Sequence, residues 1–412
     1  MPCFRLAARS AALLLVPTLA VAQGPPVRAF TGLTLIDGTT RAPVPNATIV
    51  VRDGRVVAAG PGGSVRIPVG ARLVPLTGKT VIPGIINAHG HVTDPKDLST
   101  YAAYGVTTVF SLGGEPQSVF AARAAQNTPA LDRARVFLAG TVLTPKTPDD
   151  ARSQVAEDAA QRVDIVKIRV DDNLGTIPKM TPDVYRAVIA EAHKRGMRVA
   201  THLFYLADAK SLLDAGSDFV AHSIRDADVD AEVIGKLKQR NVCVSPTLMR
   251  EVSTFVYEKT PDFFSDSLFL THANREWMAN LEKPEAQQAM RASPAAQRYK
   301  VALEVAKRNL KTLSDSGVPI AMGTDTGPTG RFQGYFELME LEQMVSAGLT
   351  PRQALTAATR DAARCMKLDR DLGTLEPGKW ADFVVLDADP LANISNVKRI
   401  ASVWIAGNQV KR

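Results

Sequence analysis

Two histidines end an apolar segment at residues 81–91 and give the strongest chemical signal in the chain. The segment reads Val-Ile-Pro-Gly-Ile-Ile-Asn-Ala-His-Gly-His, and side chains at positions i and i+2 of an extended strand point to the same face. His89 and His91 would therefore leave the strand end side by side, as two ligands of one metal ion must. Gly90 between them carries no side chain, so a metal or a substrate can approach the backbone closely.

Four other short apolar runs each carry one further side chain that can bind a metal ion. A lysine within a buried strand is unusual, because burial disfavours its charged form. Taken singly, His202 and His222 also fit partly buried side chains with satisfied hydrogen bonds. Lys167 alone fits a strand-end lysine that reaches solvent, and Asp325 alone fits a helix N-cap. Placed together at matching strand ends, the four predict one shared metal site. They are Lys167, His202, His222 and Asp325.

The elements that would position these residues alternate between short apolar strands and helical stretches, as in parallel βα units. This pattern predicts an α/β fold with a (β/α)8 TIM-type barrel, in which the carboxyl ends of all strands meet at one mouth. The expected strands are residues 81–87, 107–112, 136–139, 165–168, 198–201, 219–221, 242–245 and 319–323.

Both ends of the chain are instead rich in turns and short β segments, such as the one around the Asp53-Gly54 hairpin turn. We therefore expect a smaller β-sandwich domain formed by residues 23–80 and 373–412, with the barrel over residues 81–372. The longest connection, residues 250–298, concentrates aromatic side chains. Its length and composition favour a lid or pocket wall over a plain excursion.

Residues 1–22 read as a secretory signal peptide. Arg5 and Arg9 precede a short apolar core that is too short to span a bilayer, and Ala20-Val21-Ala22 fits a cleavage site. A buried core helix is the alternative interpretation. The signal predicts a periplasmic or secreted protein without a membrane segment after cleavage, and the residues around Cys3 do not fit a lipid-attachment site.

The formal net charge of +7 is modest for 412 residues, and the basic residues are scattered. A nucleic-acid partner is therefore not expected; a small-molecule substrate is, and a homo-oligomer stays open. Cys243 and Cys365 remain after signal cleavage. A disulfide is one interpretation in an oxidising compartment, but their wide sequence separation and the absence of a CxxC motif favour two buried free thiols.

The ordered set of motifs resembles the amidohydrolase superfamily, and within it the branch of imidazolonepropionase-like and prolidase-like metal-dependent hydrolases. The resemblance covers nearly all of the chain after the signal peptide. Any one motif alone would be weak, whereas the ordered set is specific. The matching segments are residues 83–91, 166–168, 201–202, 221–222, 323–325 and 373–382.

The resemblance implies two divalent metal ions. His89, His91 and Asp325 would hold the more buried ion, and His202 and His222 the more exposed one. Imidazole and carboxylate ligands suit Zn²⁺ best, while Mn²⁺ and Co²⁺ stay open.

The resemblance also implies that carbon dioxide carboxylates Lys167 and that the resulting carbamate bridges both ions, which requires a neutral amine. The ions would lower the pKa of a bridging water, so that hydroxide attacks an amide carbonyl. Asp325 would take the hydroxide proton and pass it to the leaving amine.

The substrate stays open at this stage. A dipeptidase or carboxypeptidase-like activity leads, followed closely by hydrolysis of N-acyl amino acids or aryl amides. Arg225 is a candidate for binding a substrate carboxylate, with a salt bridge to Asp226 or Asp228 as the alternative, and Arg169 is a second candidate. Tyr205 is a candidate hydrogen-bond donor to the tetrahedral oxyanion, with packing in the pocket as its alternative.

Two other functions compete with this interpretation. A mononuclear cyclic-amide hydrolase or deaminase of the imidazolonepropionase type would leave Lys167 without a metal. A catalytically inactive scaffold should have lost ligands, and none of the six is missing. Leu338 is one departure, because relatives often carry a histidine at that position. His193 and His272 do not fit the strand-end pattern and are expected outside the site.

Overall fold

Parallel βα units occupy the middle of the chain in the computed structural model, which describes residues 27–412. The predicted signal peptide at residues 1–22 lies outside the described residues. The α/β class is confirmed, with two parallel sheets ordered β6-β7-β8 and β13-β12-β11-β10-β9. Their strands are β6 (Ile85–Gly90), β7 (Val106–Ser111), β8 (Arg135–Leu138), β9 (Val142–Leu143), β10 (Val166–Arg169), β11 (Val199–His202), β12 (Phe219–Val220) and β13 (Cys243–Val244).

Single backbone contacts connect the two sheets on both sides. On one side the Asp164 N–H donates to the Leu138 carbonyl at 2.8 Å. On the other side the eighth predicted strand, residues 319–323, forms no ladder and makes isolated contacts instead. The Ala321 N–H donates to Val244 O in β13 at 3.0 Å, and the Ala88 N–H in β6 donates to Met322 O at 2.8 Å. This segment therefore lies between the last strand of one sheet and the first strand of the other.

The first predicted strand, residues 81–87, is two strands rather than one. β5 (Thr80–Pro83) pairs antiparallel with β14 (Phe383–Leu386), whereas β6 pairs with β7. Gly84 separates them at a tight packing point, because a Cβ built there would lie 2.0 Å from Thr107 Oγ1. The chain thus changes sheets at Gly84 immediately before the histidine pair.

Strands from both ends of the chain share one sheet of eight, where a sandwich of two sheets was expected. The sheet branches because the first half of β1 pairs with β4 and its second half pairs with β5. The branch lies at Gly32, whose φ of +77° only glycine adopts readily. The remaining strands are β1 (Arg28–Leu35), β2 (Val44–Arg52), β3 (Arg55–Pro61), β4 (Arg72–Pro75), β15 (Ile400–Ile405) and β16 (Asn408–Gln409).

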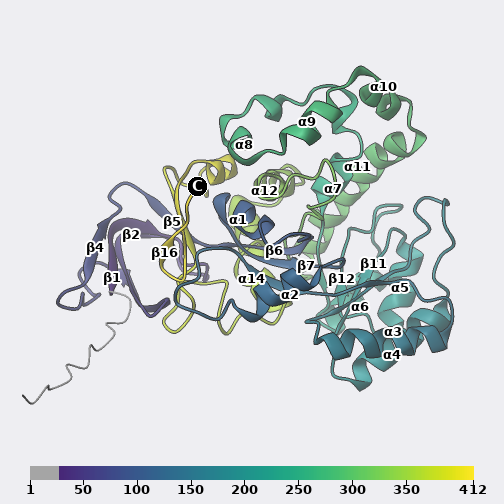
Figure 1. Ribbon diagram of the computed structural model, residues 1–412, viewed down its shortest axis with the longest axis horizontal. Coiled ribbons are helices and arrows are strands. Elements are labelled where there is room, and N and C mark those ends of the chain that lie inside the picture. The colour runs from purple at the N-terminus through teal and green to yellow at the C-terminus, as the bar shows by residue number, and fades with distance from the viewer. Residues whose placement is uncertain (1–26) are drawn as a thin grey trace, which may run out of the picture.

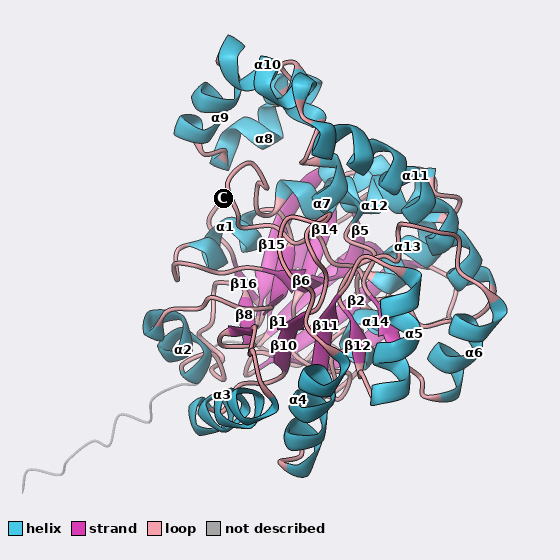
Figure 2. Ribbon diagram, turned by 90° about the vertical axis from the view of Figure 1, so that its right-hand side faces the viewer, coloured by secondary structure: helices cyan, strands magenta, loops and turns pink. Residues whose placement is uncertain are grey.

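Helices surround the parallel strands, which lie at the centre of Figure 2. Several begin with strong capping signals; in α3, Thr147 and Asp150 form a reciprocal capping box with Pro148 in the first turn. No helix within residues 27–412 is both long and apolar enough to cross a bilayer. The helices are α1 (Asp97–Ala103), α2 (Gln117–Ala124), α3 (Pro148–Gln161), α4 (Pro182–Lys194), α5 (Leu206–Ala215), α6 (Ala231–Gln239), α11 (Pro294–Asp315), α12 (Tyr335–Ser346), α13 (Pro351–Ala357) and α14 (Arg360–Cys365).

The long connection over residues 250–298 is helical and stands out at the top of Figure 1. Its aromatic side chains pack against α12 and the segment before it; the Phe269 ring, for example, lies 4.9 Å from that of Phe332. Phe269, His272 and Trp277 also line a cavity of about 300 Å³. The elements are α7 (Leu248–Val252), η1 (Val256–Glu258), η2 (Asp262–Ser265), α8 (Ser267–His272), α9 (Arg275–Leu281) and α10 (Pro284–Ala292), and a further short turn, η3 (Ile394–Lys398), precedes β15.

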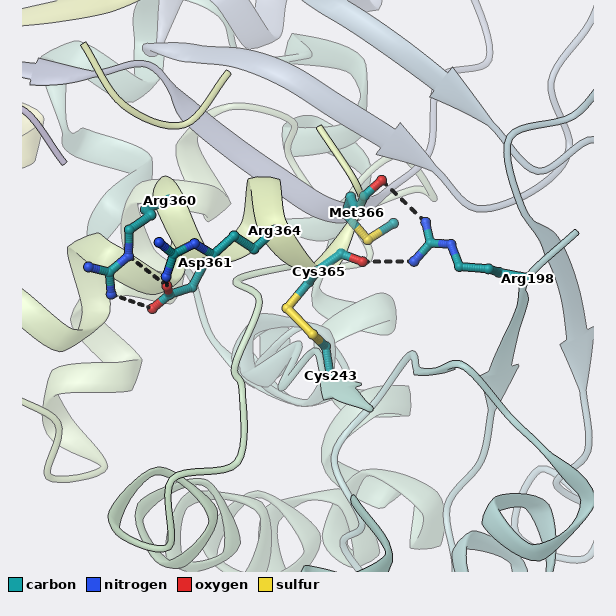
Figure 3. The surroundings of a disulfide bond; sticks show 7 residues. All are labelled: Arg198, Cys243, Arg360, Asp361, Arg364, Cys365 and Met366. Carbon is teal, nitrogen blue, oxygen red and sulfur yellow. Dashed lines mark hydrogen bonds and ion pairs between the residues drawn. A yellow bond between two sulfur atoms is a disulfide. The ribbon is translucent and has the colours of Figure 1, made fainter. Parts of the chain in front are cut away.

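Cys243 and Cys365 form a disulfide, so the expectation of two free thiols was wrong (Figure 3). Their Cα atoms lie 5.8 Å apart although 122 positions separate them in sequence. Sequence distance misled the prediction because β13 begins at one cysteine and α14 ends at the other, and the fold brings these two points together. Arg198 also contacts this corner, donating to the Cys365 carbonyl at 2.7 Å.

Loss of this disulfide should lower stability measurably. A cross-link that closes so long a loop restricts the unfolded chain, and we expect Cys365→Ser to lower the free energy of unfolding by about 2–4 kcal/mol. Denaturant unfolding of wild type and variant, each with and without reductant, measures this loss. Reductant should destabilise only the wild type; equal curves for all four samples would contradict the prediction.

Candidate metal centre

The six predicted ligands lie together at the carboxyl ends of the parallel strands, and four of them form one continuous group. Asp325 Oδ1 lies 2.8 Å from His91 Nε2 and 3.3 Å from His89 Nε2. Lys167 Nζ lies 3.2 Å from the same His89 nitrogen. Two imidazoles, a carboxylate and an amine thus point at one small volume.

The other two predicted ligands complete the cluster. His202 Nδ1 and His222 Nε2 face each other at 2.8 Å, and the ring centroids of His222 and His89 are 4.5 Å apart. His89, His222 and Asp325 each offer a ligand atom within 4.8 Å of the others, and all three are buried. The two groups therefore adjoin through the His89 and His222 rings.

The strand ends account for this convergence. His89 is the second-last residue of β6, and Lys167 lies inside β10 with its side chain buried. His202 is the last residue of β11, and His222 follows β12 by two positions. Asp325 follows the segment at residues 319–323 and adopts a φ of +59°, which turns its carboxylate toward His89 and His91.

Hydrogen bonds at the outer ring nitrogens fix which nitrogen of each histidine is free. His89 Nδ1 donates to the Ala221 carbonyl at 2.5 Å, and His91 Nδ1 donates to the Gly113 carbonyl at 2.9 Å. A carbonyl only accepts, so the proton must lie on Nδ1 and the lone pair on Nε2. In both rings that lone pair faces Asp325, as metal ligation requires.

The second histidine pair is oriented in the same way. His202 Nε2 donates to Asp171 Oδ2 at 2.9 Å, which leaves its Nδ1 lone pair facing His222. His222 Nδ1 pairs with the Thr247 hydroxyl at 2.8 Å. Asp171 was not among the predicted site residues, although its position just beyond β10 was a usable signal. No sequence pattern pointed to Thr247.

The cluster is electrostatically prepared for cations. Burial, and then the nearby charge of Lys167, lowers the pKa of His89 to about 3. Burial lowers the pKa of His202 to about 4 against the opposing effect of Asp171. Burial also holds the pKa of His222 well below its usual value. The imidazoles of His89, His202 and His222 are therefore neutral at physiological pH, the form that binds metals.

The pKa values of Lys167 and Asp325 are both lowered. Burial lowers the pKa of Lys167 to about 7, against the opposing effect of Asp325. Burial alone would raise the pKa of Asp325, but Arg331 and then His89 hold it well below its usual range. Near neutral pH the aspartate is thus ionised, while a large fraction of the amine is uncharged.

Arg331 is the most conspicuous residue that sequence reasoning missed. Its guanidinium contacts Asp325 Oδ2, the oxygen that faces away from His91, and also reaches the Ser253 hydroxyl at 3.2 Å. It stands in a loop without secondary structure, six positions after Asp325, so no periodic pattern pointed to it. Its ion pair fixes the orientation of the Asp325 carboxylate.

A buried polar network supports the same two strand ends from behind. Glu337 on α12 accepts hydrogen bonds from Asn87 Nδ2 at 2.6 Å and from the Thr324 hydroxyl at 2.7 Å. Asn87 Oδ1 in turn accepts from the His89 N–H at 2.9 Å. Glu337 therefore ties the backbone at His89 to the backbone beside Asp325. Burial raises the pKa of this glutamate.

The three predicted substrate contacts occupy different environments. Arg225 is fully buried and pairs with Glu251 at 3.0 Å, rather than with Asp226 or Asp228. The Tyr205 hydroxyl donates to Asp172 at 2.8 Å. The Arg169 side chain is 30% exposed and pairs through Nε with Asp171 at 3.2 Å.

The remaining sequence expectations concern residues outside the cluster. His193 pairs with Asp218 at 2.8 Å, and His272 lies beside Tyr104 with ring centroids 5.6 Å apart, so neither ring joins the six ligands. Leu338 is completely buried in the core.

Known proteins resemble this chain over nearly its whole length. The family model described as "Amidohydrolase family" matches residues 80–410. An imidazolonepropionase from Deinococcus deserti is 26% identical over 376 residues, covering 89% of this chain and 92% of that protein. A prolidase-like protein from Bifidobacterium longum superimposes with a TM-score of 0.79 at 26% identity, covering 95% of this chain and 96% of its own. A Xaa-Pro dipeptidase with bound methionine gives a TM-score of 0.75 at 19% identity, covering 94% and 100%, and supports the fold alone.

Proposed function

This chain belongs to the amidohydrolase family and is a metal-dependent hydrolase that acts on C–N bonds, and from that premise we propose that it cleaves the amide bond of a small peptide-like substrate. A dipeptidase or carboxypeptidase-like activity comes first, and hydrolysis of N-acyl amino acids or aryl amides second. The observation that carries the proposal is the cluster of four oriented imidazoles, one amine and one carboxylate at a single set of strand ends.

The donor set fits two divalent ions. His89, His91 and Asp325 would hold one ion, and His202 and His222 the other. Each histidine has one nitrogen engaged by an outer partner and the other turned inward, which is the usual arrangement of metal-binding imidazoles. Nitrogen and carboxylate donors suit Zn²⁺.

Lys167 would link the two ions as a carbamate. Its Nζ lies 3.2 Å from His89 Nε2, within a buried site. In the reaction the neutral amine nitrogen bonds to the carbon of carbon dioxide and releases one proton. The product would be an anionic carbamate with two oxygens, and two cations held by the neighbouring ligands would stabilise that charge.

The hydrolysis needs a proton to move from water to the leaving nitrogen, and the chain itself can carry it in two transfers. When bound, the metal ions would polarise the amide carbonyl and lower the pKa of a water molecule. Asp325 would accept the proton that this water loses as its oxygen bonds to the carbonyl carbon. It would then deliver the proton to the amide nitrogen as the C–N bond breaks, so that acid and amine leave as separate products. Arg331 holds Asp325 in position for both transfers.

The architecture and the compartment belong to the same proposal. We propose that the two parallel sheets and the segment at residues 319–323 form one (β/α)8 barrel, supported by the backbone contacts on both of its sides. We also propose a periplasmic or secreted location. The disulfide supports it, because such bonds persist in oxidising compartments.

A substrate screen with metal analysis tests the proposed function. The purified protein, loaded with Zn²⁺, Mn²⁺ or Co²⁺, is assayed against dipeptides, N-acyl amino acids, lactams and aryl amides. We expect two metal ions per chain by elemental analysis and turnover of open-chain amides. One ion per chain together with turnover of lactams or cyclic amidines alone would favour the mononuclear alternative. Full metal content without turnover of any class would favour the inactive scaffold.

A further inference from the structure

A cavity of about 300 Å³ lies beside the candidate metal centre, at the carboxyl ends of β9 and β10. Lys146, from the segment after β9, and Arg169, the last residue of β10, line one part of it. The loop leading to α4 supplies apolar side chains to the rest, among them Ile177 and Met180. Ile177 is 43% exposed, which leaves it free to contact a ligand.

Asp171 links the cavity to the second histidine pair. Its side chain lines the cavity and accepts hydrogen bonds with both of its oxygens, from Arg169 Nε at 3.2 Å and from His202 Nε2 at 2.9 Å. Asp171 is almost completely buried. A group bound at Arg169 would therefore lie one side chain away from a predicted metal ligand.

Positive charge exceeds negative charge around this cavity. Three cationic side chains line it, and Asp171 is the only acidic residue among the lining residues within the described chain. Lys179 is already engaged, since its Nζ lies 2.8 Å from Asp208 and 3.8 Å from the centre of the Tyr205 ring. Arg169 pairs through Nε only, so its two Nη groups have no protein partner within residues 27–412. Lys146 Nζ likewise has no protein partner among these residues.

We propose that this cavity is the subsite for a carboxylate carried on an apolar part of the substrate, with Arg169 and Lys146 as its ligands. Two Nη groups in a plane match the two oxygens of a carboxylate, and Ile177 and Met180 would contact the adjoining apolar group. A volume near the lower end for ligand pockets accommodates about one amino-acid residue. The inference rests on the proposed function and specifies its substrate class as amides with a free acidic end.

The other arginine considered for this role is closed to a ligand. The Arg225 side chain has no exposed surface, and its Nη1 donates to the carbonyls of Leu203 and Ser223 at 2.9 and 2.7 Å. Its partner Glu251 is equally buried and is shared with Arg250 at 3.0 Å. Arg225 therefore holds neighbouring loops together, and Arg169 is the guanidinium that a substrate can reach.

The test compares substrates that differ only in the acidic end. Dipeptides and N-acetyl amino acids are assayed beside their C-terminal amides with the metal-loaded wild type and with Lys146→Gln, Arg169→Gln and Arg186→Gln. Arg186 is an exposed cation on α4 outside the cavity and serves as the matched control. Binding of N-acetyl-L-leucine, N-acetyl-L-leucinamide and inorganic phosphate is measured by calorimetry, which does not depend on turnover.

We expect wild type to favour the free acid over its amide by at least about tenfold in kcat/KM and in affinity. Lys146→Gln and Arg169→Gln should bring that ratio toward one, and Arg186→Gln should keep it. A general disturbance of the metal centre through Asp171 would lower kcat/KM for the acid and for the amide alike and leave their ratio unchanged. A ratio near one in wild type, an unchanged ratio in both cavity variants, or equally tight phosphate binding would overturn the subsite. Equal turnover of acids and amides would contradict the subsite and leave the proposed function intact. Preferential binding of the acids without any turnover would support the subsite and contradict the proposed function.

Discussion

Asp325→Asn should lower kcat by about 10³-fold or more while the protein stays folded and keeps most of its metal. The substitution retains a side-chain oxygen that can bind a cation, but an amide cannot accept and return a proton near neutral pH. Proton transfer by a positioned side chain contributes about 10²–10⁴-fold to a rate. The lost contact with Arg331 would add to the effect, because that ion pair orients the carboxylate.

Steady-state kinetics, elemental analysis and thermal melting on the same preparation measure this effect. Asp226→Asn is the matched control, since Asp226 is an exposed acid that accepts a hydrogen bond from the Leu206 N–H at 2.8 Å. Its activity should stay within a few-fold of wild type. An Asp325→Asn variant with full metal content and near-normal turnover would exclude Asp325 as the proton carrier.

The positions of the six clustered residues could be predicted because strand periodicity is a local property. An apolar run of a few residues ending in a polar one marks a strand terminus, and parallel strands place their carboxyl ends at one edge. His202 and His222 were accessible to this reasoning without any knowledge of their neighbours. The same reasoning found Lys167, since a lysine inside an apolar run conflicts with burial unless a partner compensates.

Contacts between distant segments could not be predicted in this way. Arg331 contacts Asp325 from a loop, and Glu337 reaches Asn87 across 250 positions of sequence. The prediction for the two cysteines failed for the same reason, because the proximity of Cys243 and Cys365 depends on how the parallel strands and α14 are assembled. The branching of the terminal sheet at Gly32 depends on three partners of β1, which no single-strand pattern contains.

Lys167→Ala should abolish most activity and reduce the metal content from two ions toward one per chain. The substitution removes the amine that would carry the bridging carbamate and leaves a small buried space at β10. Because Lys167 Nζ lies 3.2 Å from His89 Nε2, a short carboxylic acid such as acetate or propionate should enter that space and supply two oxygens in place of the carbamate. We therefore expect partial recovery of activity with millimolar amounts of these acids, and none in wild type. Lys236→Ala, on α6, is the control and should bind metal and turn over normally.

Wild-type reconstitution gives an independent readout of the same lysine. Only the neutral amine reacts with carbon dioxide, and the pKa of Lys167 is lowered by burial to about 7. As the pH falls through this value the amine becomes an ammonium, so metal uptake by the metal-free protein should slow below about pH 7 and accelerate when bicarbonate is added above it. Lys167→Ala should show neither dependence, because it has no amine to carboxylate. Uptake of two ions at one rate across this range, with full activity in Lys167→Ala, would mean that the two sites form without a bridge and that the mononuclear relatives are the better guide to this enzyme.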